Sequence, residues 1–219
     1  MTRVKLIRLS GWGMVLAAFA LLLTFLPEAD KILDTLYQTF GAPATSARQD
    51  SNLRLFEGLR SFPFPLAILL ITFGLLGLYI CYGKQAGNSA KIALGVGILG
   101  GAAGLVSIVW MALGIDNGRS AMNGSMAFMF AGLFVFGLVA LRVKLMSRGN
   151  ILPVLAGFWW PSVVINAYVY PQVTGHMGPE VPVWLSFAIF SLMSFFLALL
   201  GYVLQADVPR LIDITSYEV

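Results

Sequence analysis

The segment "IALGVGILGGAAGLVSIVWMALGI", residues 92–115, decides the fold. It carries no charged side chain, and an α-helix needs only ~20 apolar residues to cross the hydrocarbon core of a membrane. Five other segments share this character, and none has Asp, Glu, Lys, Arg or His in its interior. We therefore predict six membrane spans, at residues 9–27, 64–83, 92–115, 120–141, 151–170 and 181–205.

The composition of the whole chain agrees with this prediction. Of 219 residues, 58% are hydrophobic and only 11% are charged, whereas soluble domains carry about 25% charged residues. We expect one polytopic domain over residues 1–219, an all-α bundle of six transmembrane helices. The net charge of +4 falls in short clusters between apolar segments, so we expect membrane lipids as partners and no nucleic acid.

The distribution of Lys and Arg predicts the orientation, because cytoplasmic loops are enriched in these residues. With the N-terminus inside, nine of the fourteen basic residues lie in cytoplasmic segments and five lie outside. Both termini are therefore predicted to be cytoplasmic in a multi-pass protein of the cell membrane. The first span resembles a signal peptide in outline, but no small-x-small cleavage site follows it, which favours an uncleaved anchor.

The first outside loop, residues 28–63, is long enough to predict structure of its own. Apolar residues in "PEADKILDTLYQTFG", residues 27–41, and in "LRLFEGLRSF", residues 53–62, share one helical face. Two short amphipathic helices would form an extracytoplasmic lid over a cavity or a docking surface. A connector that packs on the helix ends is the alternative.

Small residues predict how the helices pack, because transmembrane helices associate through close backbone approach. In the third span, Gly97 and Gly101 are four residues apart, and so are Gly100 and Gly104. We expect this helix at the centre of the bundle. A second packing face in the sixth span consists of Ser191, Ser194, Ala198 and Gly201.

The fifth span contains the candidate binding residues. At about 100° per residue, Trp159, Ser162, Asn166 and Tyr170 fall within about 80° of one another on a helix. The stripe begins about 13 Å into the span, where bare polar groups in hydrocarbon would cost several kcal/mol. It must face protein, a ligand or water. A pocket wall for an amphipathic molecule and hydrogen-bonded glue between helices both satisfy this condition.

The chemistry missing from the spans limits the function. Ion-coupled carriers usually need ionisable groups inside the membrane, and these spans contain none. The only histidine, His176, lies in a predicted outside loop, and Cys81 is the only cysteine. We therefore expect no catalytic residue, no metal site and no cofactor, and a protein that is not an enzyme.

Two functions agree with these observations. The first is a non-enzymatic membrane protein that binds or passively passes a lipid-like or small amphipathic molecule. The second is a structural or accessory subunit of a larger membrane complex, with other subunits or copies of itself as partners. A cavity reaching from the lid to Asn166 would favour the first, and a lipid-facing groove of small residues would favour the second.

Overall fold

The computed structural model describes residues 3–24, 63–114, 118–159 and 183–216. These residues form helices and the turns between them, and the described part contains no strand. The helices are α1 (Arg3–Leu23), α4 (Pro63–Tyr82), α5 (Gly87–Ala112), α6 (Gly118–Val143), α7 (Leu152–Gly157) and α10 (Val183–Ser216).

Five of these helices are long and apolar enough to cross a membrane: α1, α4, α5, α6 and α10. They confirm the all-helical class and indicate a multi-pass membrane protein. The predicted fifth span, 151–170, lies within the described residues only as far as Trp159, so a count of six spans goes beyond them. The predicted lid, 28–63, lies outside the described residues except for Pro63, which begins α4.

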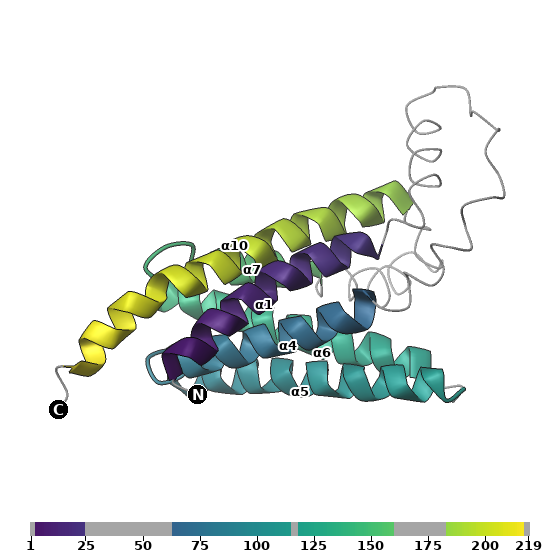
Figure 1. Ribbon diagram of the computed structural model, residues 1–219, viewed down its shortest axis with the longest axis horizontal. Helices are drawn as coiled ribbons and strands as arrows, with labels where there is room; N and C mark the ends of the chain where they lie inside the picture. Colours follow the sequence, from purple (N-terminus) through teal and green to yellow (C-terminus); the bar gives the residue numbers. More distant parts are fainter. Residues whose placement is uncertain (1–2, 25–62, 115–117, 160–182, 217–219) are drawn as a thin grey trace, which may run out of the picture.

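The helix bounds differ from the predicted spans mainly at the two ends of the chain. Helix α1 begins at Arg3 rather than Leu9, and Lys5 and Arg8 occupy exposed positions on it. Helix α10 continues past Gln205 to Ser216 and includes Pro209 (Figure 1). Charged residues mark where the membrane ends, whereas a helix can continue into the interface because long basic side chains reach water.

The helices pack as an antiparallel bundle (Figure 1). Helices α5 and α6 form the most extensive pair, α4 lies between α5 and α1, and α1 packs along α10. The short helix α7 contacts both α6 and α10. The expectation that the third span is central is wrong for the described elements. Helix α5 packs on α4 and α6 and turns Ile92, Leu99 and Val109 outward.

The four glycines of α5 that predicted packing, Gly97, Gly100, Gly101 and Gly104, lie buried against its two neighbours. A Cβ at Gly100 would lie 2.6 Å from the backbone nitrogen of Met129 on α6, and one at Gly97 would lie 3.2 Å from the carbonyl oxygen of Met129. Gly101 and Gly104 face Thr72 and Ile68 of α4. The glycines therefore serve packing within this chain, and the close approach to α6 needs a glycine there as well, Gly132.

The small-residue face of α10 has a comparable role at its C-terminal half. Gly201 and Ser194 are buried, and Ser191 and Ala198 are half-buried. A Cβ at Gly201 would lie 2.5 Å from the carbonyl oxygen of Gly11 on α1. Two glycines on facing helices thus set the closest approach of α1 and α10.

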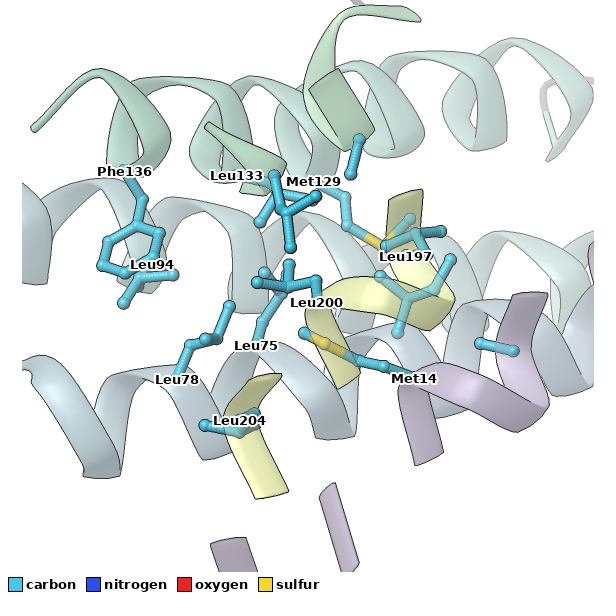
Figure 2. Packing of buried hydrophobic residues seen from close by; sticks show 14 of the residues in the cluster. Met14, Leu75, Leu78, Leu94, Met129, Leu133, Phe136, Leu197, Leu200 and Leu204 are labelled. Carbon is cyan, nitrogen blue, oxygen red and sulfur yellow. The ribbon is translucent and has the colours of Figure 1, made fainter. Parts of the chain in front are cut away.

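Apolar side chains from the five long helices meet in one core (Figure 2). Met14 of α1 and Leu75 of α4 point toward Leu200 of α10, with Leu94 of α5 and Leu133 of α6 beyond them. All five are essentially inaccessible to solvent. The core is continuous from α1 to α6, so the described helices form one packed unit.

Candidate functional site: a buried aspartate and an aromatic cluster

Asp207 is the one acidic residue whose side chain the structure describes, and it is 4% exposed. It lies on α10 inside the segment Phe187–Val208, which is apolar enough to span a membrane. The predicted last span, 181–205, contains no ionisable residue, but it ends two positions before this carboxylate. Asp207 was therefore not selected from the sequence.

Three donors surround the Asp207 carboxylate. The Tyr82 hydroxyl donates a hydrogen bond of 2.6 Å to Oδ2, and the Ser147 backbone N–H donates one of 3.2 Å to the same oxygen. The Ser147 hydroxyl donates to Oδ1. Hydrogen bonds to a charged group are stronger than neutral ones, and a buried carboxylate without them would be costly. The cluster therefore ties the end of α4, the α6–α7 turn and α10 together.

The turn that presents Ser147 is fixed by its own hydrogen bonds. Asn150 Oδ1 accepts from the Met146 N–H at 2.8 Å, and Asn150 Nδ2 donates to the Met146 carbonyl at 2.9 Å. Lys144 and Gly149 on either side have φ values of 50° and 71°, a conformation that few residues other than glycine and asparagine adopt readily. The asparagine thus closes the turn, and the closed turn aims Ser147 at Asp207.

Trp159 is the one member of the predicted binding stripe that the structure describes. Its ring lies edge-on to Phe130 of α6 and tilted against Phe190 of α10, with both centroid distances at 5.5 Å. Such separations are typical of attractive aromatic pairs. The side chain is half-buried and joins α6 to α10. Ser162, Asn166 and Tyr170 lie outside the described residues.

Two hydroxyls on α10 lie close in sequence to this aromatic cluster. Ser191 Oγ and Ser194 Oγ are buried and make no hydrogen bond. Elsewhere in the described helices, buried hydroxyls bond to a carbonyl three or four residues earlier, as at Ser10, Thr72, Ser107 and Ser125. Phe190 and Ser194 are four residues apart and share one helix face. An unused polar group therefore lies one helical turn from the aromatic rings.

The described residues contain no group of three or more His, Cys, Asp or Glu side chains that could hold a metal ion. Asp207 is held by two hydroxyl groups and an amide rather than by other carboxylates. The arrangement can therefore fix the relative positions of three segments, and it offers no ligand set for a divalent cation.

Comparison with known proteins identifies no relative. No family model matches the chain, and neither a curated protein nor a solved structure is significantly similar to it. The class of protein therefore rests on the fold: a multi-pass helical membrane protein in which Asp207 is buried at an end of the described bundle.

Proposed function

We propose that this chain is a non-enzymatic membrane protein that binds or passively passes a lipid-like or small amphipathic molecule. The observation that carries the proposal is the aromatic cluster of Phe130, Trp159 and Phe190, with the buried Ser194 hydroxyl one turn away. Sites for small ligands combine apolar and aromatic walls with a few polar groups that fix orientation. An amphipathic molecule needs both kinds of surface.

A six-span topology fits this function, and the beginning of the predicted fifth span supports it. A Cβ at Gly137 would meet Val154, and one at Gly157 would lie 2.6 Å from the backbone nitrogen of Phe134. Helix α7 therefore runs antiparallel to α6, back toward the opposite end of the bundle. Since α10 returns to Ser147 at Asp207, these contacts support a crossing between α7 and α10 in the proposed topology.

The orientation proposed with this topology has both termini in the cytoplasm and the 28–63 segment outside the cell membrane. The N-terminal residues, the α4–α5 turn and the α6–α7 turn lie at one end of the bundle (Figure 1). These segments carry most of the basic residues outside the 28–63 loop, as cytoplasmic segments do.

The alternative, an accessory subunit of a larger complex, had two supports. One is the lack of catalytic chemistry in the sequence, and the other, a glycine-rich helix able to receive a partner, is weakened. Four glycines of α5, at positions 97, 100, 101 and 104, are instead covered by α4 and α6 of the same chain. The described residues therefore present no free groove at these four positions.

Native mass spectrometry of the protein, taken from its own membrane into lipid nanodiscs, tests the proposal. We expect a 23.7 kDa chain that carries one stoichiometric extra mass. Trp159→Leu should lose this mass, whereas Trp12→Leu, at an exposed position of α1, should keep it. Both variants should elute as monodisperse folded protein. A larger assembly with other chains and no small bound mass would contradict the proposal and favour the subunit role.

A further inference from the structure

We propose that the end of the bundle that contains Asp207 binds the phosphate headgroups of anionic phospholipids. Seven basic side chains belong to this surface, which we call the basic end. Lys91 is half-buried and the other six are exposed. The seven are Lys5, Arg8, Lys84, Lys91, Arg142, Lys144 and Arg148.

Contacts between the helices bring these residues to the same end. The Tyr82–Asp207–Ser147 cluster joins the end of α4 to the α6–α7 turn, so Lys84 lies at the same end as the cations of that turn. A Cβ at Gly11 would lie 2.7 Å from Cγ of Gln205, two residues before Asp207. The beginning of α1, with Lys5 and Arg8, is thereby placed beside the same cluster.

The charge of the basic end is not neutralised by the acid beside it. Asp207 is the only acidic side chain that the structure describes, and it is buried, with its oxygens bonded to Tyr82 and Ser147. Among the residues whose side chains the structure describes, the basic end therefore presents seven cations and no exposed carboxylate. A surface of one charge sign attracts partners of the opposite sign.

The position of these cations favours lipid over an acidic protein as the partner. All seven lie in, or within a few residues of, the ends of helices that are able to cross a membrane, so the bilayer places them at headgroup depth. Long Lys and Arg side chains at helix ends reach the interface. Near an anionic leaflet, each such cation strengthens binding roughly fivefold. This inference is independent of the ligand proposed for Trp159.

The test uses the purified full chain in nanodiscs made from equal amounts of phosphatidylglycerol and phosphatidylcholine. Native mass spectrometry counts the lipids that stay bound after the disc is removed. We expect the wild type to retain phosphatidylglycerol in clear excess, and the excess to shrink in high salt because exposed charges are screened. Equal retention of the two lipids by the wild type would overturn the proposal.

Two variants locate the effect. Arg142→Gln with Lys144→Gln and Arg148→Gln should reduce the excess severalfold, whereas Arg119→Gln, at the start of α6 and the opposite end of the bundle, should not. If the triple variant does not fold, Lys84→Gln with Lys91→Gln tests the same surface away from the α6–α7 turn. An unchanged excess in a folded variant of either kind would show that the basic end is not the lipid site.

Discussion

At the residue scale, Tyr82 is the side chain on which the polar cluster most depends. Its hydroxyl bonds a buried carboxylate at 2.6 Å, and a hydrogen bond to a charged group contributes about 1.5–3 kcal/mol. Tyr82→Phe removes that bond and little volume. We expect it to lower the free energy of unfolding by about this amount, measured by denaturant titration in detergent micelles.

Tyr79 provides the matched control for this substitution. It lies on the same helix less than one turn earlier and is exposed, so Tyr79→Phe should change stability by less than about 0.5 kcal/mol. If the two substitutions changed the free energy of unfolding equally, the hydrogen bond from Tyr82 to Asp207 would make no specific contribution to stability.

Asp207 allows the charge and the shape of the cluster to be separated. Asp207→Asn keeps an acceptor for Tyr82 and Ser147, whereas Asp207→Leu leaves their hydroxyl groups without one. A buried donor that loses its partner costs about 1–3 kcal/mol. We therefore expect the leucine variant to be clearly less stable than the asparagine variant, by thermal unfolding in micelles. The reverse order would show that burying the charge costs more than its hydrogen bonds return.

The sequence could not predict this cluster because its residues lie far apart along the chain. Tyr82 and Asp207 are 125 positions apart, and each stands at the edge of an apolar segment, where a polar residue ordinarily faces water. Hydropathy locates the segment but not the partner. The stripe that begins at Trp159 was predicted from helical spacing alone, and only Trp159 itself can be compared with the structure.

At the element scale, the contact between α5 and α6 depends on glycines that leave no room for a side chain. In Gly100→Ala the new methyl would lie 2.6 Å from the Met129 nitrogen and 2.8 Å from the Ser125 oxygen, both backbone atoms that cannot move away separately. Overpacking of this kind costs about 1–3 kcal/mol. We expect a corresponding fall in the midpoint of thermal unfolding in micelles.

At Gly95, on the same helix, we expect replacement by alanine to cause no loss of stability. A Cβ there meets nothing within 4 Å, and alanine is favoured over glycine in a helix interior by about 0.5–1 kcal/mol. Gly95→Ala should therefore leave stability unchanged or raise it. A similar loss in both variants would trace the effect to the helix itself rather than to its contact with α6.

The sequence predicted where the helices lie along the chain better than it predicted how they pack together. Helices α4, α5 and α6 follow from apolar length, because the membrane imposes that length on any spanning helix. The position of α5 within the bundle does not follow from apolar length. Its glycines predict a close neighbour, but they do not say how many sides of the helix are covered, and Leu99, between two of them, is 70% exposed.

At the scale of the whole molecule, the path of the chain predicts which positions can be labelled from outside. Ser147 and Asp207 are in contact, so α6 and α10 both finish at the basic end. With about 1.5 Å per residue, the start of α10 at Val183 lies roughly 36 Å from Asp207. In the proposed six-span arrangement, residues 152–182 cover that distance as the additional crossing.

Single cysteines in a Cys81→Ala background test this topology, with a membrane-impermeant maleimide applied to intact cells that express the protein. We expect Arg119→Cys and His176→Cys to react in intact cells, and Lys84→Cys only after lysis, because Lys84 belongs to the basic end and positive charge is retained in the cytoplasm. If His176→Cys, like Lys84→Cys, reacted only after lysis, residues 152–182 would not cross the membrane, and the six-span arrangement would be wrong. If Lys84→Cys reacted in intact cells and the other two variants reacted only after lysis, the six spans would have the opposite orientation. The basic end would then face the outer leaflet.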